Sequence, residues 1–452
     1  MNFTDPRKAA LFVLNELARR NSNLDRILDE QANRLFSQMP RRDRALANAL
    51  VYGVLRWRAN LDWHIASFAS RPVNRIKPEI LNILRIGVFQ MMFMSRIPQS
   101  AAVNTSVEMA KEFAPGPVVR FVNGLLRNAA RSRQAVSGPD PEKDPVKALA
   151  VDQSFPQWLV KRWKNRFGIG ETRLLCEYLN EIPPVTIRTN TLKTTRDSLV
   201  EKLSASADSA EKTAYSRHGI AMHGITSPVD QLTGFEEGLF QVQDEAAQLA
   251  GLVLAPQPAE SVLDACAGLG GKTGHLAQCM ENQGRLVAVD SEKAKLCILD
   301  SEMKRLGITI VETRCLDMET PGSDTDPEGF ERIMVDAPCS GLGVIRRNPD
   351  IKWSAHKRDM DRHSLRQTRI LAVAAGHLKP GGTLVYAVCS MEPEETDSVA
   401  DGFCEKSKEF EIDPIGSRPE DPRIGADEKG YLRLFPHLHG TDGFFVARFK
   451  RK

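Results

Sequence analysis

The segment Glu331–Ile351, ERIMVDAPCSGLGVIRRNPDI, decides which fold the rest of the chain has to form. It begins with the apolar run Ile333–Val335, which is typical of a buried strand. This strand is followed at once by Asp336 and, three residues later, by Cys339. In an open α/β sheet, the loops after the carboxyl ends of the strands bind ligands. An acid and a thiol in this position therefore predict a chemical site at one edge of a sheet.

A second thiol follows another apolar run. The segment Gly382–Ser390, GTLVYAVCS, is typical of a buried strand and ends at Cys389. If the two strands are neighbours in one parallel sheet, Cys339 and Cys389 face the same crevice. We therefore treat the two cysteines as candidates for chemistry and not as ordinary buried side chains.

Strands alternate with helices from Phe240 onward. The predicted strands are SVLDAC (261–266), RLVAVD (285–290), ITIVET (308–313), ERIMVDAP (331–338) and GTLVYAVCS (382–390). Repeated strand–helix–strand units predict a mostly parallel sheet with right-handed crossovers. The end of the chain, YLRLFPHLHGTDGFFVARFK (431–450), has the pattern of an antiparallel hairpin.

The N-terminal part is different in pattern and in charge. Residues 1–135 show only helical periodicity, and PEILNILRIGVFQMMFMSRI (78–97) is apolar nearly all round, which predicts a buried central helix. The segment 42–68 is predicted to be one further helix. Residues 1–135 carry a net charge of +11, whereas the remainder carries −8. This asymmetry favours a module that binds a polyanion, and the alternative is a helical domain with solvated arginines.

Four segments follow from these patterns. We expect an all-α domain over 1–135, a linker over 136–150, a small α+β subdomain over 151–239, and an α/β catalytic domain over 240–452. In the third segment, two helical patterns precede the strands at 183–193 and 219–225, while 204–218 is expected to be a loop.

Composition excludes several classes of protein. The chain has 452 residues, of which 42% are hydrophobic and 26% charged, as in ordinary globular proteins. No run of about 18 apolar residues is present, so we expect no membrane span, and the N-terminal pattern is not that of a signal peptide, which favours the cytoplasm. None of the eight cysteines forms a C-x-x-C pair and no histidine pair has zinc spacing, so no metal site is expected.

The segment DACAGLGGKT (264–273) joins a strand to a helix through three glycines. A nucleoside triphosphate loop needs glycine where Cys266 stands, which excludes that type of site. Asp290 ends the next strand, where an acid binds the hydroxyl groups of a ribose, and Asp317 follows the third strand, where it would face an adenine. These features favour S-adenosylmethionine, and the alternative is an α/β domain whose aspartates only cap helices. The residues expected to cradle the cofactor are Cys266, Ala267, Gly268, Leu269, Gly270, Gly271 and Lys272.

With these residues in view, the chain resembles the bacterial 16S ribosomal RNA cytosine-5 methyltransferases of the Sun/RsmB type. The resemblance covers nearly the whole chain. It rests on YGVLRWRANLDW (52–63) and VNGLLRN (122–128), which resemble a NusB-like RNA-binding domain, and on VQDEAAQLAG (242–251), DACAGLGGKT (264–273), DAPCSGLGVIRRNPDIKW (336–353), VYAVCSMEPEE (385–395) and DGFFVARFK (442–450). It implies a NusB-like domain, a small α+β subdomain, and a Rossmann-like class I methyltransferase with a mostly parallel seven-stranded sheet.

The resemblance also implies roles for the two thiols. Cytosine C5 is too weak a nucleophile to accept a methyl group until a thiolate adds at C6, which is an instance of covalent catalysis. By resemblance, Cys389 is that nucleophile and Cys339 assists release of the adduct. Asp336 would hydrogen-bond the base and also lie at the cofactor, and Lys272 would contact both.

Four positions depart from the family pattern. Gly268 and Leu269 replace an alanine and a proline in the cofactor loop, Val388 replaces a threonine before the nucleophile, and Thr396 replaces an asparagine. None of these changes removes a thiol, an acid or Lys272. We therefore expect an active enzyme.

The implied substrate is a cytosine in 16S ribosomal RNA, by resemblance cytosine 967, methylated by a monomeric enzyme before the subunit is fully assembled. Specific RNA recognition usually reads loops and bulges, so we expect a hairpin loop. Alternatives are a cytosine-5 methyltransferase for transfer RNA or another ribosomal site, and a non-catalytic RNA-binding assembly factor. A DNA methyltransferase would use the thiol of the Pro-Cys motif as nucleophile, which leaves the second thiol unexplained.

Overall fold

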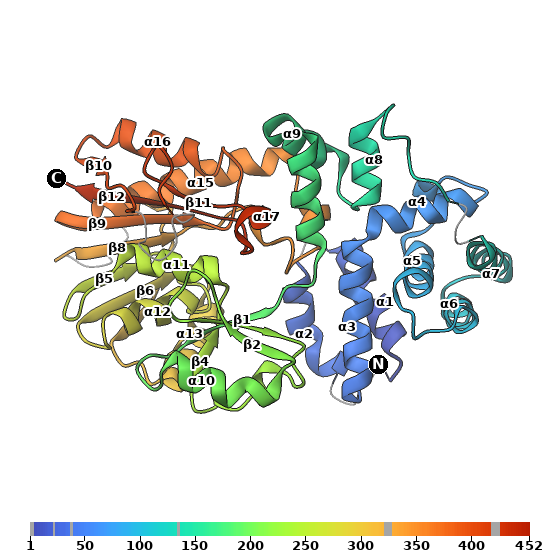
Figure 1. The fold of residues 1–452 in the computed structure, drawn as a ribbon, viewed down its shortest axis with the longest axis horizontal. Coiled ribbons are helices and arrows are strands. Elements are labelled where there is room, and N and C mark those ends of the chain that lie inside the picture. The colour runs from blue at the N-terminus through green and yellow to red at the C-terminus, as the bar shows by residue number, and fades with distance from the viewer. Residues whose placement is uncertain (1–3, 21–22, 37–38, 133–135, 321–327, 417–424) are drawn as a thin grey trace. The chain divides into compact units, whose positions relative to one another are not determined.

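The computed structural model describes residues 4–20, 23–36, 39–132, 136–320, 328–416 and 425–452, and it divides into two compact units (Figure 1). The first, here called the helical unit, comprises Met1–Glu181 together with Arg347–Ser354. The second, here called the sheet unit, comprises Ile182–Arg346 and Ala355–Lys452. Segment 347–354 thus belongs to the helical unit, although it follows the Cys339 motif directly in the sequence.

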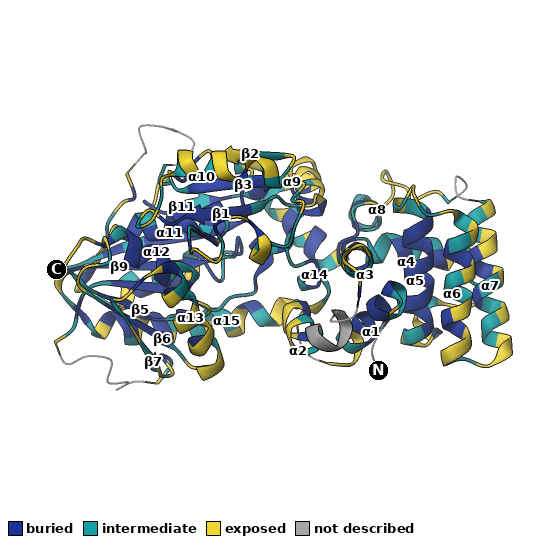
Figure 2. Cartoon of the chain, turned by 90° about the horizontal axis from the view of Figure 1, so that it is seen from below, coloured by how far each residue is buried: buried dark blue, intermediate teal, exposed yellow. Residues whose placement is uncertain are grey.

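The helical unit contains only helices among its described residues. They are α1 (Pro6–Arg19), α2 (Leu24–Phe36), α3 (Arg41–Arg56), α4 (Arg58–Phe68), the 3-10 helix η1 (Val73–Arg75), α5 (Pro78–Phe93), α6 (Gln99–Phe113), α7 (Gly116–Arg131), α8 (Pro145–Asp152), α9 (Gln157–Asn180) and α14 (Ile351–Ser354). Helix α5 is buried from Ile80 through Met91, which confirms the predicted central helix (Figure 2).

Two details of the helical unit differ from the sequence patterns. The single helix predicted over 42–68 is broken at Trp57, whose φ of −110° and ψ of 17° separate α3 from α4. The segment expected to be a linker contains α8, whose N-cap Asp144 accepts a hydrogen bond from Lys147 N. The two helices predicted to open the next segment are confirmed: the range of α9 is interrupted at Gly168, whose φ of 82° suits glycine and is not helical.

The sheet unit begins with a small antiparallel sheet. Its strands are β1 (Val185–Thr189), β2 (Ser209–Lys212), β3 (Gly219–His223) and β4 (Phe240–Val242), in the order β2-β3-β1-β4. Helix α10 (Arg196–Leu203) packs against it through Leu199 and Leu203, which are fully buried. Strand β2 lies within 204–218, which the sequence predicts to be a loop. The four residues of β2 are weakly apolar and give no strand pattern, so the sequence does not predict this strand.

The large sheet has eight strands, one more than the resemblance implies. Its strands are β5 (Ser261–Asp264), β6 (Arg285–Asp290), β7 (Val311–Cys315), β8 (Phe330–Asp336), β9 (Leu378–Val388), β10 (Phe410–Ile412), β11 (Leu432–Leu434) and β12 (Phe444–Arg451). Seven of them form the path β10-β12-β9-β8-β5-β6-β7, and β11 pairs with β12 outside it. Strands β5 to β9 pair in parallel, and β12 pairs antiparallel with β9, β10 and β11. The predicted mostly parallel sheet and its terminal hairpin are confirmed.

Helices cover both faces of this sheet (Figure 1). One face packs against α11 (Glu245–Leu254), α12 (Gly271–Cys279) and α13 (Lys293–Leu306), and the other against α15 (Lys357–Gly376) and α16 (Asp397–Lys406). Side chains alternate along β9: Val385 and Ala387 face the first layer, whereas Leu384, Tyr386 and Val388 face the second. With both faces covered, the edge formed by the carboxyl ends of the parallel strands is left for ligands.

Candidate active site

The two candidate thiols meet at this edge of the sheet. Strands β8 and β9 pair in parallel with Asp336 opposite Ala387, so Cys339 and Cys389 emerge from the ends of adjacent strands. Their sulfur atoms are 3.2 Å apart, and both residues are half-buried. The sequence prediction that the two thiols share one crevice agrees with this geometry. The hydrogen bond with Cys389, and then burial, hold the pKa of the Cys339 thiol well above its ordinary value, so Cys339 retains its proton.

An ion pair lies beside the thiols. Lys272, the second residue of α12, places its Nζ 2.6 Å from Asp336 Oδ2, and 5.3 Å from the centroid of the Phe444 ring. Burial acts to lower the pKa of Lys272, but the Asp336 carboxylate opposes it and the pKa lies above the ordinary value. Lys272 is therefore a cation, and its partner carboxylate is fixed next to the loop that carries Cys339.

The glycine-rich loop between β5 and α12 has the shape of a ligand cradle. Gly268 and Gly270 have φ values of 56° and 87°, in the region that favours glycine. Added Cβ atoms at Gly268 and Gly271 would meet nothing within 4 Å, so space is open on the loop. Gly268 N donates to Asp290 Oδ2 at 3.1 Å, which places the β6 acid directly against the loop. Backbone N–H groups, open glycines and one carboxylate suit a nucleoside with a charged amino-acid tail.

The remaining cofactor candidates differ in position. Ala267 is buried and its N donates to Val289 O at 2.8 Å, which fixes the start of the loop, whereas Leu269 is 53% exposed. Burial raises the pKa of the Cys266 thiol well above its ordinary value, which suits a lining residue more than a nucleophile. Asp317 lies exposed after β7, and its Oδ1 accepts from Glu319 N at 2.9 Å. Its contact with adenine stays a prediction from the sequence.

Glu395 ends the motif VYAVCSMEPEE, and its role is not predicted by the sequence. Its buried carboxylate accepts hydrogen bonds from Ser340 N at 2.7 Å, from Ser340 Oγ at 2.5 Å and from Ser390 Oγ at 2.5 Å. Ser340 follows Cys339 and Ser390 follows Cys389, so one carboxylate ties together the two loops that carry the thiols. The signal in the sequence was a carboxylate six residues after a strand-end thiol, which does not reveal its partner 55 residues away.

Asp264, at the end of β5, was also missed as a site residue. Its fully buried carboxyl group accepts from Thr273 Oγ1 at 2.8 Å. Burial raises its pKa to about 7, in spite of the opposing hydrogen bond from Thr273. The hydrogen bond joins the start of the glycine loop to the first turn of α12.

Arg188 of β1 holds the glycine-rich loop in place by hydrogen bonds. This guanidinium is fully buried and donates to Gly271 O at 2.7 Å, Gln278 Oε1 at 2.6 Å and Gln241 Oε1 at 2.9 Å. It also donates to Gln243 Oε1, and all four acceptors are neutral oxygens. Strand β1 of the small sheet thereby fixes the N-terminus of α12, one residue before Lys272.

Within the described parts of the chain, no three His, Cys, Asp or Glu side chains gather as metal ligands would. No helix in those same parts is both long enough and apolar enough to cross a membrane.

Family models match three parts of the chain. The NusB family matches residues 4–131, a ferredoxin-like domain of RsmF/B-like methyltransferases matches 155–229, and the 16S rRNA methyltransferase RsmB/F matches 251–450. The sequence is 35% identical to "Probable ribosomal RNA small subunit methyltransferase B" of Bacillus subtilis (strain 168), over 100% of both chains. It is 34% identical to the protein of the same name in Synechocystis sp., over 98% of this chain and 99% of that one.

Solved structures agree with this relationship. The crystal structure of the protein PH0851 aligns with a TM-score of 0.82 at 25% identity, over 99% of each chain. A methyltransferase homologue from Pyrococcus horikoshii aligns with a TM-score of 0.59 at 27% identity, over 68% of this chain and 99% of that one. The glycine loop, Asp290 and the covered parallel sheet fit the cofactor of such enzymes, S-adenosylmethionine. On these grounds the chain belongs to the 16S rRNA methyltransferase RsmB/F family and is an S-adenosylmethionine-dependent rRNA methyltransferase.

Proposed function

We propose that this enzyme methylates C5 of one cytosine in 16S ribosomal RNA through a covalent bond between Cys389 Sγ and C6 of the base. The observation that carries the proposal is the 3.2 Å separation of Cys339 Sγ and Cys389 Sγ at the ends of two adjacent parallel strands. Methylation of a heteroatom needs no nucleophilic thiol, whereas methylation at C5 needs one to activate the ring and benefits from a second group that removes a proton.

S-adenosylmethionine supplies an electrophilic methyl group, and the loop from Cys266 to Lys272 with Asp290, Asp317 and Asp336 would hold it. The residues of the chain then act in sequence. The Cys389 thiolate adds to C6, and the electron pair of the C5–C6 double bond makes C5 nucleophilic. Lys272, paired with Asp336 at 2.6 Å, keeps this carboxylate in place to hydrogen-bond the base. After C5 is methylated, Cys339 passes its own proton to solvent and the resulting thiolate takes the proton from C5. The C5–C6 double bond then re-forms, and Cys389 departs as a thiolate.

The environment of Cys339 supports this division of roles. A thiol whose pKa is held high by a hydrogen bond and by burial is a poor nucleophile at neutral pH and a strong proton acceptor once it has ionised. Glu395 supports the arrangement by fixing the loops on either side of the thiol pair.

The proposed target is a hairpin-loop cytosine, by family resemblance cytosine 967, that leaves its stack to enter the site before the subunit is fully assembled. We propose that the enzyme acts as a monomer in the cytoplasm. The basic N-terminal segment, with its net charge of +11 over residues 1–135, favours an RNA polyanion as the partner.

Bisulfite sequencing of ribosomal and transfer RNA from cells with and without the gene tests the proposal. Loss of one methylated cytosine in 16S RNA is the expected result. Loss in transfer RNA would retain the chemistry and overturn the substrate. Unchanged methylation in every RNA, together with no 5-methylcytosine formed by purified enzyme with S-adenosylmethionine, would overturn the reaction and favour the assembly-factor alternative.

A further inference from the structure

The helical unit has a hollow of its own, of about 560 Å³. It is lined by residues from α4, η1, α5 and α14, among them Arg58, Asp62, Trp63, Asn74, Arg85 and Trp353. Two guanidinium groups and two indoles around one hollow are the side chains that bind phosphate and stack on bases.

The two arginines in this hollow are in different electrostatic situations. Arg85 is fully engaged: its Nε and Nη2 donate to Asp62 Oδ1 and Oδ2, each at 2.7 Å, and its Nη1 donates to Asn82 Oδ1 at 2.9 Å. Arg85 therefore uses both oxygens of the carboxylate. The charge of Arg85 is therefore balanced by Asp62, and Arg58 supplies the remaining positive charge of the hollow.

Arg58 has no hydrogen bond or ion pair with any residue that the structure describes, and its guanidinium lies 5.2 Å from the centroid of the Trp353 ring. Burial, and then the charge of Arg85, lower its pKa to about 10. A half-buried guanidinium presents five N–H donors, and leaving them without acceptors is costly. An anion in the hollow would relieve both the desolvation and the repulsion from Arg85.

The aromatic wall of the hollow is rigid. Trp353 Nε1 donates to Leu55 O at 2.6 Å, which fixes the plane of its ring. The preceding residue, Lys352, is fully buried and donates to Asn180 Oδ1 at 2.6 Å and Arg56 O at 3.1 Å. A fixed indole beside a cation is a preformed platform for a nucleotide, because little side-chain freedom is lost on binding.

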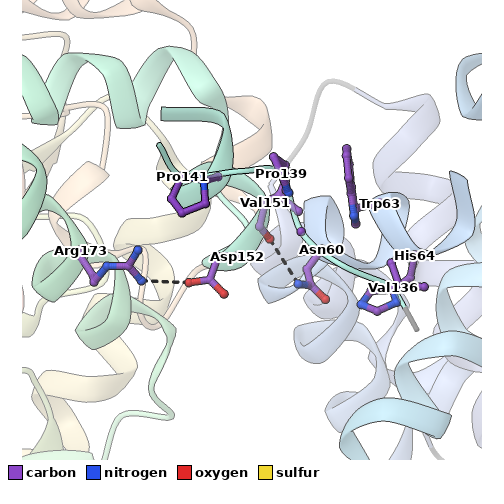
Figure 3. A pocket seen from close by; sticks show the side chains of 11 residues that line it. Asn60, Trp63, His64, Val136, Pro139, Pro141, Val151, Asp152 and Arg173 are labelled. Carbon is purple, nitrogen blue, oxygen red and sulfur yellow. Dashed lines mark hydrogen bonds and ion pairs between the residues drawn. The ribbon is translucent and has the colours of Figure 1, made fainter. Parts of the chain in front are cut away.

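A second hollow, bordered by the same Trp63, provides a contrast (Figure 3). Its arginine, Arg173, points at Asp152 and is 3.1 Å from Oδ2, and it lies 3.8 Å from Glu177. Asn60 Nδ2 donates to Val151 O at 3.3 Å. The cation in this hollow is already neutralised by carboxylates, so the hollow offers no comparable attraction for an anion.

We propose that Arg58, stacked on Trp353, holds one phosphodiester of the substrate RNA in the hollow of the helical unit, with the adjacent base against an indole. The inference rests on the proposed function, because RNA as the substrate makes a nucleotide the relevant anion. It adds to that function a defined RNA contact made by the helical unit, distinct from the thiol site.

The test is the salt dependence of binding to a 16S RNA transcript by full-length Arg58→Gln. Each lost phosphate contact lowers the slope of log K against log salt by about 0.7 to 0.9. We expect a slope lower by about this amount for Arg58→Gln, with roughly three- to tenfold weaker binding, and a slope close to wild type for Arg58→Lys, which keeps the charge.

Arg71→Gln is the matched control, because Arg71 also lies over an aromatic ring, 4.9 Å from the centroid of Phe121, but does not line the hollow. An unchanged slope for Arg58→Gln, or an equal decrease for Arg71→Gln, would overturn the inference. Thermal unfolding of each variant verifies that it is folded. If the wild-type protein does not bind the transcript at all, the proposed substrate is wrong. If the wild type binds normally and Arg58→Gln has an unchanged slope, only the proposed phosphate site is wrong.

Discussion

Cys339 Sγ and Cys389 Sγ lie 3.2 Å apart, although 50 residues separate them in the sequence. The distance follows from the sheet. Strands β8 and β9 are parallel neighbours with Asp336 opposite Ala387, so each thiol emerges from its strand at the same edge. Side-chain hydrogen bonds to Glu395 then hold the two loops in register. The sheet brings the thiols near to each other, and the carboxylate fixes their spacing.

The division of roles between the thiols predicts a trapped complex. With Cys339→Ala, Cys389 still adds to C6 but the step that removes the C5 proton is impaired, so a covalent RNA–protein adduct accumulates. A band of reduced mobility on a denaturing gel, sensitive to ribonuclease, is the expected result.

Cys389→Ala is the control for this experiment. It should form neither adduct nor 5-methylcytosine, and the double variant should behave in the same way. If Cys389→Ala gave the adduct and Cys339→Ala did not, the nucleophile would be Cys339.

Glu395→Gln tests the spacing of the thiols. The amide retains the shape of the side chain but loses the negative charge and one acceptor oxygen, so the loops at Ser340 and Ser390 are held less tightly. Misplacement of reacting groups by about 1 Å costs about 10²-fold in rate, and we expect kcat to fall by roughly 10- to 100-fold.

The affinity for S-adenosylmethionine, measured by calorimetry, should change little in Glu395→Gln, because Glu395 contacts the thiol loops and not the glycine loop. Glu394→Gln, one residue earlier, is the matched control. Equal losses of kcat in both variants would show that the hydrogen bonds to Ser340 and Ser390 are not the cause.

Arg188→Met tests the support of the cofactor loop. The change removes the donor of the Gly271 carbonyl and of three glutamine amide oxygens, those of Gln241, Gln243 and Gln278. Each buried group that loses its partner costs about 1 to 3 kcal/mol. We expect the Kd for S-adenosylmethionine to rise by about tenfold or more. Restoration of binding by added guanidinium ion would show that the lost group is responsible.

Arg305→Met is the control for Arg188→Met. Arg305 also joins the small sheet to the large one, since it donates to Phe240 O at 3.2 Å, but it does so from α13. Arg305→Met should lower the free energy of unfolding but change the Kd for S-adenosylmethionine less than Arg188→Met does. A Kd unchanged by Arg188→Met would contradict the role of Arg188.

Asp264 predicts a pH dependence of stability. Its pKa is about 7 in the folded protein against an ordinary value of 3.8, because burial disfavours the charged form. Between these two values the folded state holds a proton that the unfolded state releases, so the free energy of unfolding falls as the pH rises through this window.

Asp264→Asn lacks this titration and keeps an acceptor for Thr273. Urea denaturation from pH 4 to pH 8 should therefore show wild type losing stability relative to Asp264→Asn, by a few kcal/mol at most, since one pKa unit corresponds to about 1.4 kcal/mol. Parallel curves for the two proteins over this range would contradict the prediction.

The sequence by itself determined the order of elements and most of the chemistry. Apolar runs followed by acids and thiols predicted where the strands end, because the strand period and the turn residues are local properties. The glycines at 268, 270 and 271, Asp336 and the two cysteines were found in this way. The role of Lys272 came from the family resemblance, and its ion pair with Asp336 came only from the structure. Strand β2 was missed because its residues Ser209–Lys212 have no apolar alternation, and pairing with β3 supplies what local propensity lacks.

Only the tertiary structure decided which distant groups support the site. Glu395 bonds to Ser340 across 55 residues and Arg188 bonds to Gly271 across 83, and neither partner can be read from local pattern. Lys352 follows the Cys339 motif in sequence, yet its Nζ donates to oxygens of Arg56 and Asn180 within the helical unit. Buried polar groups must find acceptors wherever the packed chain supplies them, so their partners are fixed by the three-dimensional fold and not by spacing along the sequence.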